Sequence, residues 1–388
     1  MGERETVTSN AGLLKSRSWE LEWNWLADPE RDLHNKTKRE GKPTMFYIGM
    51  DVHGKWTRIE GFDPDTGETV SFPKVPNDPE ALREVFSALE GPIHAAMEIG
   101  TNAWAMYWTL RELLDHLMVV DTLETWGKTG RRGAKTDKRD AKGLAQKLYE
   151  GKLKALYVPD KLTQDYRCLI RARVSTTRRV TALVNEVGAV LRSWGIVVEC
   201  SLLTDKGRML IEKSREGLPE NSLLVLDGLL EQLDCASRQE DLFTQRIEKL
   251  AAEDETCRIL MSAPGVGPIT AFAMRAEVGD IRRFPSAKHL VSYCGLGPLV
   301  EQSAEKLRRG KLPKACNKVL RYLLLLRGSG LATAKGDNPI RRAFLRTALR
   351  GHVNDGKVNG ARKLVRIMYA MMKYQEPWDP MKAAARST

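Results

Sequence analysis

Four acidic residues occur where a fold could gather them into a metal site. Asp51 ends one apolar, β-prone stretch, and Glu98 ends another. Asp137 and Asp140 are three positions apart, so a helix would place them on one face. Acids from two strand ends and one helix can meet at one edge of a sheet, where they repel unless a divalent cation neutralises them. We therefore expect the four carboxylates to hold Mg²⁺ or Mn²⁺ and to assist phosphoryl transfer, although each acid alone is typical of an ordinary turn.

The segments that must position these acids have the pattern of an α/β domain spanning residues 44–158. Polar and proline-containing caps separate apolar runs of strand or helix periodicity. Strands are predicted at 45–52, 56–62, 68–72, 93–98 and 117–121, and helices from 77, at 103–116 and at 137–149. Three strands followed by alternating helices and strands is the element order of a ribonuclease-H-like domain.

Two long stretches with helical spacing, 163–194 and 222–252, follow this domain. They predict an antiparallel helical hairpin or coiled coil within a linker at 159–256, which is structural or forms a dimer. The first stretch is rich in arginine, and nucleic acid could lie along it. We expect three of these arginines to contact nucleic acid, namely Arg171, Arg178 and Arg179.

The C-terminal part, 257–388, is predicted to be mainly helical and basic, so the fold class is α/β plus α. Gly265 and Gly267 stand between two helical runs, as in a helix–hairpin–helix element that offers backbone N–H groups to a phosphate. An ordinary glycine turn between helices is the alternative. Residues 1–43 are predicted to be a polar extension with one short helix around 18–27.

Charge and composition narrow the function classes. The formal net charge is +12, and it is concentrated: residues 300–388 carry +14 and residues 121–200 carry +8. Such localised positive charge favours a polyanionic partner, most often nucleic acid, over solvated basic helices without a partner. The six cysteines form no C-x-x-C pair, and no long apolar run is present, so a zinc ribbon and a membrane span are not expected. The expected location is the reducing cytoplasm.

Several motifs resemble those of one family. Ile48-Gly-Met-Asp51-Val-His, Met97-Glu98-Ile-Gly-Thr and Lys135-Thr-Asp137-Lys-Arg-Asp140-Ala-Lys-Gly-Leu-Ala are similar to the Asp-Glu-Asp-Asp signature of the IS110 insertion-sequence transposases, which also include the Piv DNA invertases. The segments Ala263-Pro-Gly-Val-Gly-Pro-Ile-Thr-Ala and Phe284-Pro-Ser-Ala-Lys-His-Leu-Val-Ser-Tyr-Cys-Gly-Leu-Gly-Pro298 resemble the C-terminal domain of that family.

The resemblance implies a RuvC-like N-terminal domain, a coiled-coil linker and a C-terminal domain with a nucleophilic serine. Ser303 occupies the position of that serine, between the Gly-Leu-Gly-Pro segment and a basic run. The surrounding residues Gln302, Ala304 and Glu305 differ from the usual serine and glycine. By resemblance, Ser303 attacks a DNA phosphate to form a 5′-phosphoserine, assisted by the metal-bound acids of another subunit in a homodimer or tetramer.

The resemblance also implies the partners: donor DNA, target DNA and a noncoding bridge RNA, in a protein associated with the nucleoid. The expected contacts, besides those above, are Lys135, Lys138, Arg139, Lys306, Arg308, Arg309, Lys311 and Lys314. Two alternatives remain open. A RuvC-like, metal-dependent junction nuclease would need the four acids but not Ser303, and a catalytically inactive nucleic-acid-binding relative would need neither.

Overall fold

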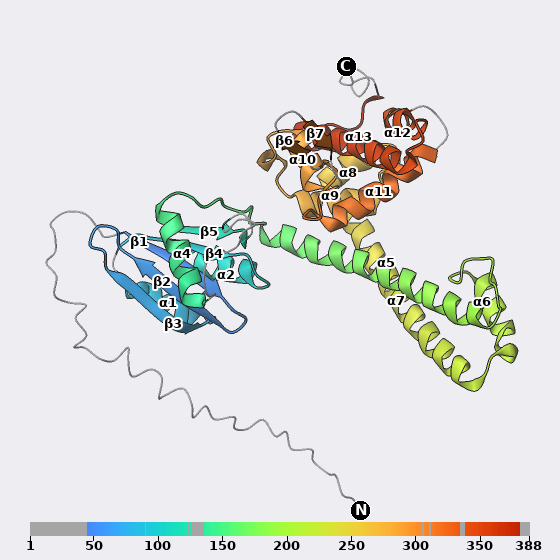
Figure 1. The fold of residues 1–388 in the computed structure, drawn as a ribbon, viewed down its shortest axis with the longest axis horizontal. Helices are drawn as coiled ribbons and strands as arrows, with labels where there is room; N and C mark the ends of the chain where they lie inside the picture. Colours follow the sequence, from blue (N-terminus) through green and yellow to red (C-terminus); the bar gives the residue numbers. More distant parts are fainter. Residues whose placement is uncertain are drawn as a thin grey trace, which may run out of the picture. The chain divides into compact units, whose positions relative to one another are not determined.

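The computed structural model describes residues 45–89, 91–122, 125, 136–298, 300–303, 306–309, 312–333 and 338–380. The chain divides into two compact units, of which the first ends at Leu156 and the second begins at Tyr157 (Figure 1). The predicted extension 1–43, with its short helix, lies outside the described residues. In the described part of the chain, no helix combines the length and the apolar character needed to cross a membrane.

The first unit is built on a mixed five-stranded sheet, and its strand order is β3-β2-β1-β4-β5. The central strand β1 runs antiparallel to β2 and parallel to β4, and β4 is parallel to β5. The strands are β1 Phe46–Val52, β2 Trp56–Phe62, β3 Thr69–Pro76, β4 Ile93–Glu98 and β5 His116–Val120. The predicted α/β class and the predicted order of elements are therefore confirmed.

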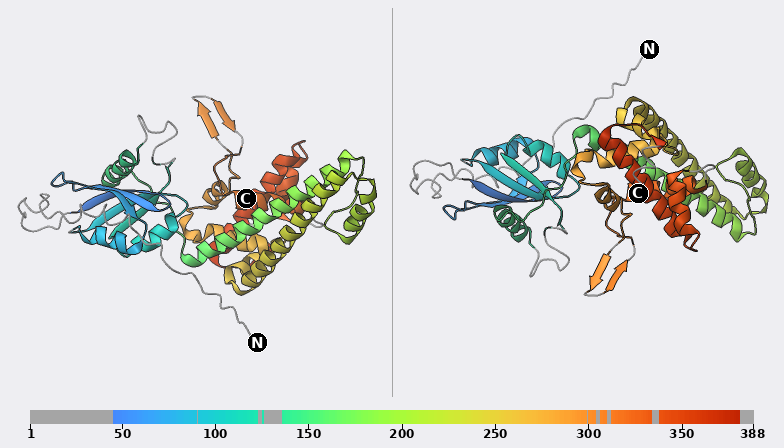
Figure 2. Two further views of the ribbon diagram at one scale, coloured as in Figure 1. Left: turned by 90° about the horizontal axis from the view of Figure 1, so that it is seen from below. Right: turned by 90° about the horizontal axis from the view of Figure 1, so that it is seen from above.

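Helices cover both faces of this sheet. Helix α4 (Asp137–Tyr149) covers one face, and α1 (Pro79–Ser87) and α2 (Ala103–Leu110) lie on the other (Figure 2). The predicted helix 103–116 is too long, because α2 ends at Leu110. The carboxylate of Asp115 instead accepts a hydrogen bond of 2.7 Å from the backbone N–H of Ile93, the first residue of β4. This bond keeps Asp115 out of the helix and next to the sheet.

The second unit begins with two long antiparallel helices, α5 (Lys161–Ser193) and α7 (Glu220–Glu253) (Figure 1). Val180 packs with Leu233 and Ala236, and nearer the turn Val187 packs with Leu226, which confirms the predicted antiparallel hairpin. Between the two helices lie α6 (Asp205–Lys213) and a 3-10 turn, Arg215–Gly217, which the sequence pattern did not predict.

The rest of the second unit is mainly helical, as predicted. Its helices are α8 Glu255–Met261, α9 Pro268–Val278, a 3-10 turn Ile281–Arg283, α10 Ala287–Tyr293, α11 Lys318–Thr333, α12 Pro339–Ala348 and α13 Val353–Tyr374. They share one core with the base of the α5–α7 hairpin, where Tyr166 and Ile247 pack around Phe272 of the buried helix α9. An unpredicted β-hairpin, β6 (Val300–Ser303) and β7 (Lys306–Arg309), extends from these helices (Figure 2).

Candidate functional site

The close packing of α4 against β1 fixes where two of the predicted acids lie. A Cβ atom on Gly49 would lie 2.7 Å from the backbone nitrogen of Ala145 and closer still to the carbonyl oxygen of Ala141, so only glycine fits there. Because side chains alternate along a strand, Asp51 faces the same side of the sheet as Gly49. The first turn of α4 therefore lies beside the end of β1, and Asp137 lies near Asp51.

Asp51, His53 and Asp137 form one compact cluster at this edge of the sheet. The Nε2 atom of His53 lies 3.5 Å from Oδ2 of Asp51 and 3.4 Å from Oδ2 of Asp137. Each residue offers one possible ligand atom within 4.8 Å of the other two. The Asp51 and Asp137 side chains are 27% and 45% exposed, so a substrate can reach them.

The turn after β1 holds His53 in this position. Its ring stacks on Trp56 with the ring centroids 3.9 Å apart, and its backbone N–H donates to the carbonyl of Trp56 at 2.9 Å. The carbonyl of His53 accepts from the side-chain amides of Asn77, at 2.7 Å, and Asn102, at 2.9 Å. Asn77 follows β3 and Asn102 precedes α2, so two further segments of the first unit fix the turn.

The atoms of this cluster fit a divalent cation. The Nε2 atom of His53 is buried and makes no hydrogen bond to any described residue, yet it faces two carboxylates. Two carboxylates this close repel, and either a protonated imidazole or a bound cation relieves that repulsion. Carboxylate oxygens suit Mg²⁺ or Mn²⁺, and an imidazole nitrogen favours a transition ion such as Mn²⁺.

His53 is a candidate ligand that a pattern of acids alone does not reveal. It follows Asp51 by two positions, which in an extended chain places both side chains on the same side. That spacing, together with the affinity of imidazole for metals, is the signal that the sequence carries.

Glu98 and Asp140 lie at the same edge but, in the described structure, outside the cluster of Asp51, His53 and Asp137. The register of the parallel strands β1 and β4 brings Glu98 next to Asp51. The Oε2 atom of Glu98 accepts a hydrogen bond of 2.9 Å from the hydroxyl of Thr122. Asp140 is only 5% exposed and lies in the first turn of α4, where the positive end of the helix dipole favours a carboxylate. A site made by all four acids stays a prediction.

The predicted nucleophile, Ser303, is the last residue of β6. Its backbone pairs with that of Lys306 on β7, so it lies at the end of a strand. The expected contacts Lys306, Arg308 and Arg309 are on β7, while Lys135 and Lys311 lie outside the described residues. The catalytic role of Ser303 stays a prediction.

Backbone and side-chain bonds fix the base of the β6–β7 hairpin. The backbone N–H of Asn317, after the hairpin, donates to the carbonyl of Tyr293, before it, at 3.0 Å. The Nε atom of Arg362 on α13 donates to the carbonyl of Leu296 at 2.6 Å. The side-chain amide of Asn317 also donates to Oε2 of Glu277 at 2.7 Å. The hairpin is therefore attached to α9, α10 and α13 at its base.

Glu277 is the centre of a buried network between α5 and α9. Its side chain is 0% exposed, and its two carboxylate oxygens accept from Nε and Nη2 of Arg171 at 2.7 and 2.8 Å. These hydrogen bonds are the main reason that the pKa of Arg171 lies above its ordinary value. Arg167 donates to the carbonyls of Ala276 and Glu277, and burial lowers its pKa. Arg171 thus has a structural partner, and its predicted contact with nucleic acid stays a prediction.

The other expected contacts differ in their surroundings. Lys138, Arg139, Arg178, Arg179 and Lys314 are all exposed. The guanidinium of Arg178 lies over the ring of Tyr322, 5.1 Å from its centroid. Their contacts with nucleic acid stay predictions.

The glycine turn lies between two helices, as predicted. Gly265 has φ +75°, a conformation that favours glycine, and Gly267 is the N-cap residue of α9. Ala263 and Val266 of the same turn are buried, so the turn packs on the core through its apolar residues. Binding of a phosphate by this turn stays a prediction.

Comparisons with known proteins match both units. A family model described as "Transposase IS116/IS110/IS902 family" matches residues 257–328, and a second model described as "Transposase" matches residues 48–195. The chain is 26% identical over 349 residues to the transposase for insertion sequence element IS1111A of Coxiella burnetii, covering 88% of this chain and 94% of that protein. It is 25% identical over 311 residues to a probable family 20 transposase of Pseudomonas aeruginosa, covering 77% and 89%. The two model matches together span more than half of the chain and include all four predicted acids as well as Ser303, so the chain belongs to the IS110 family of insertion-sequence transposases.

Proposed function

We propose that this protein is a recombinase that moves an insertion sequence by cutting and rejoining DNA at two centres, a metal site in the first unit and Ser303 in the second. The observation that carries the proposal is the Asp51–His53–Asp137 cluster, because it brings together acids from a strand end and a helix start in a chain of this family. The sheet order β3-β2-β1-β4-β5 supports the RuvC-like fold that we propose for this unit.

In the proposed site, Asp51, Asp137 and His53 hold a divalent ion, Mg²⁺ or Mn²⁺, with Glu98 and Asp140 completing its surroundings. A bound divalent ion neutralises phosphate charge and makes an oxygen more nucleophilic or a better leaving group. Because the side chains of Asp51 and Asp137 are partly exposed, a DNA phosphate could reach an ion that they would hold. The buried carboxylate of Asp140 adds negative charge near the site, and the positive N-terminal end of α4 offsets part of that charge.

In the proposed reaction, the hydroxyl oxygen of Ser303 attacks a DNA phosphorus atom. A bond forms between the serine oxygen and phosphorus, the bond from phosphorus to the 3′ oxygen breaks, and that oxygen leaves as a hydroxyl after taking up the proton that serine has lost. The product is a 5′-phosphoserine, which the 3′ hydroxyl of another strand then attacks to rejoin DNA and release Ser303. In this proposal Lys306, Arg308 and Arg309 of β7 would pair with the phosphate charge.

We further propose that the protein acts as a homodimer or tetramer in the cytoplasm, on the nucleoid, and that a bridge RNA selects donor and target DNA. The exposed Arg178 and Arg179 on α5, Lys138 and Arg139 on α4, and the charge of +14 in residues 300–388 would contact the phosphate backbones of these nucleic acids. The α5–α7 hairpin offers a long surface for a second subunit.

The test is strand exchange between a DNA carrying the junction of the element and a target DNA, measured with and without the RNA and with Mg²⁺, Mn²⁺ or a chelator. The proposal expects joined products only when a divalent ion is present, and more of them with the RNA. A junction nuclease, for which the metal cluster suffices, would give cut but unjoined DNA. An inactive relative would bind DNA and leave it intact, and either of these results would contradict the proposal.

A further inference from the structure

A second candidate site lies in the C-terminal helices, between α12 and α13. A pocket of about 500 Å³ opens between α12, α13 and the segment that follows α13. This volume is in the range of ligand sites in proteins. At the end of α13, Gln375 has φ +52° and turns the chain back, and the backbone N–H of Trp378 donates to the hydroxyl of Ser262 at 2.7 Å. These contacts hold in place the segment after α13, which forms one side of the pocket.

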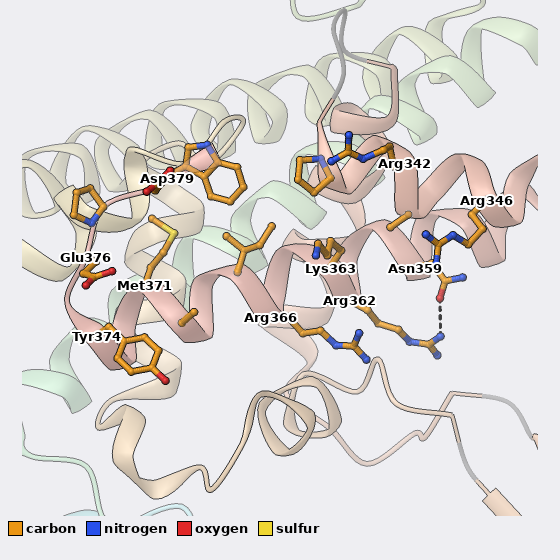
Figure 3. Close-up of a pocket in the computed structure, with 16 residues that line it drawn as sticks. Arg342, Arg346, Asn359, Arg362, Lys363, Arg366, Met371, Tyr374, Glu376 and Asp379 are labelled. Carbon is orange, nitrogen blue, oxygen red and sulfur yellow. Dashed lines mark hydrogen bonds between the residues drawn. The ribbon is translucent and has the colours of Figure 1, made fainter. Parts of the chain in front are cut away.

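One end of the pocket is strongly cationic. Arg342 and Arg346 come from α12, and Arg362, Lys363 and Arg366 come from α13 (Figure 3). Helix α12 contains no acid, and α13 contains only Asp355, in its first turn. Burial lowers the pKa of Lys363, and three arginines near it lower that pKa further. This crowding of like charges favours the binding of an anion.

One of these cations is already oriented by the protein. The Nη1 atom of Arg362 donates to the side-chain carbonyl of Asn359 at 2.8 Å, and the amide of Asn359 donates to the hydroxyl of Thr347 on α12 at 2.5 Å. These bonds link the two helices at the cationic end. The planar N–H donors of a guanidinium group match the oxygens of a phosphate, so a phosphate fits this end.

The other end of the pocket has a different chemistry. Met371, Tyr374, Glu376 and Asp379 line it, together with Trp378, and the labelled residues lie well apart from the arginines in the view of the pocket (Figure 3). Aromatic rings bind the faces of nucleobases by stacking. Carboxylates accept hydrogen bonds from base amino groups, as they do from N4 of cytosine. This end therefore suits a planar base with N–H donors.

We propose that this pocket binds one unpaired nucleotide of a nucleic-acid single strand, with its phosphate among the arginines and its base beside Tyr374 and Trp378. A duplex keeps its bases stacked inside, so it can offer only phosphates to the cationic end, whereas a single strand can fill both ends. The proposal deepens the proposed function, because it takes nucleic acid as the partner and assigns an unpaired segment of it to α12 and α13.

The test measures binding of fluorescent oligonucleotides to the full-length protein by anisotropy, without divalent ions and in the Ser303→Ala background, so that no strand chemistry takes place. Single-stranded DNA, single-stranded RNA and a DNA duplex of equal length are compared. Tyr374→Ala removes a ring that is 52% exposed and hence little needed for folding. The double variant Arg346→Gln with Arg366→Gln removes two exposed charges of the pocket. Its matched control is Arg327→Gln with Arg350→Gln, two exposed arginines outside the pocket.

Tyr374→Ala is expected to weaken single-strand binding at least about fivefold and to leave duplex binding unchanged, as loss of one stacking contact predicts. Replacing the two pocket arginines is expected to make the negative slope of log affinity against log salt shallower by about 1.4 for single strands. The control pair is expected to change this slope by clearly less. This pattern with either DNA or RNA supports the proposal.

Three results would overturn it: equal losses for single strands and duplex in Tyr374→Ala, a control pair as damaging as the pocket pair, or a phosphopeptide that binds the natural protein and not the pocket arginine variant while that variant binds single strands as the natural protein does. Failure of the proposed function is a separate result. If the protein performs no strand exchange but Tyr374→Ala still weakens only single-strand binding, the recombinase proposal is wrong and the nucleotide site is still supported.

Discussion

Replacing Gly49 by alanine should disturb the Asp51–His53–Asp137 cluster while the first unit stays folded. The added methyl group would lie 2.7 Å from the backbone nitrogen of Ala145 and even nearer the carbonyl oxygen of Ala141. Normal contacts of carbon atoms are about 3.5 to 4.0 Å, so α4 must retreat from β1 by on the order of 1 Å. Both neighbours are backbone atoms, which no rotamer change can move. Overpacking of this kind costs about 1–3 kcal/mol, and here the upper part of that range is expected.

The same retreat carries Asp137 away from Asp51 and His53, whose ligand atoms now lie within 4.8 Å of one another. A displacement of about 1 Å in a reacting site can cost a factor of about 100 in rate. We therefore expect Gly49→Ala to lose strand-exchange activity by about that factor and to bind Mn²⁺ more weakly, at a temperature where circular dichroism shows the protein folded.

Gly54→Ala is the matched control, because a Cβ atom at Gly54 meets nothing within 4 Å although it is next to His53. This variant should keep the activity, the Mn²⁺ affinity and the melting temperature of the natural protein. If Gly49→Ala matched the natural protein in Mn²⁺ binding and activity, the α4–β1 contact would not be what aligns the site.

Three further predictions concern single groups. Changing any one predicted acid to its amide should abolish strand exchange and leave folding and DNA binding intact, since it removes a charge and little volume. The changes are Asp51→Asn, Glu98→Gln, Asp137→Asn and Asp140→Asn. Full strand-exchange activity in two of these variants would contradict the assignment of the acids to a metal site. His53→Gln should reduce the affinity for Mn²⁺ more than that for Mg²⁺, measured by calorimetry, because it replaces the nitrogen ligand by a weaker one; equal losses for both ions would argue against His53 as a ligand. Glu277→Ala should lower the free energy of unfolding by about 3–5 kcal/mol in urea titrations. It removes the carboxylate that accepts from Arg171 and Asn317 and that lies 3.9 Å from Nε of the buried Arg167. A change below about 1 kcal/mol would contradict the structural role of this network.

The sequence predicted the first unit well because its apolar periodicity and caps agree with one another. The strand 56–62 and the helix 137–149 occur as predicted, and Thr136 caps that helix by accepting from the backbone N–H of Arg139. The predicted edge of the sheet gathers Asp51 and Asp137 because β1 and α4 run side by side in opposite directions. Local periodicity and the position of acids at segment ends were sufficient for this part.

Other features depend on contacts that local patterns do not contain. The hairpin 300–309 has only Val300 and Leu307 as large apolar residues, so it lacks the alternation that identifies a strand. Helix α6 is short and contains Gly207, whose absent Cβ lets the helix pack tightly against the backbone of Leu202. The position of His53 depends on Asn77 and Asn102, which are distant in sequence. Tertiary contacts of this kind appear only in the fold.

The measurement that tests the central claim most directly is the search for a covalent bond between the protein and DNA. The protein is incubated with Mg²⁺ or Mn²⁺ and labelled DNA carrying the junction of the element, denatured, separated by electrophoresis and digested for mass spectrometry. The account predicts a phosphodiester on the peptide that contains Ser303, joined to a 5′ DNA end, and none in Ser303→Ala or without a divalent ion. Cut DNA without any adduct, or an adduct that forms at the natural rate in Ser303→Ala, would contradict it.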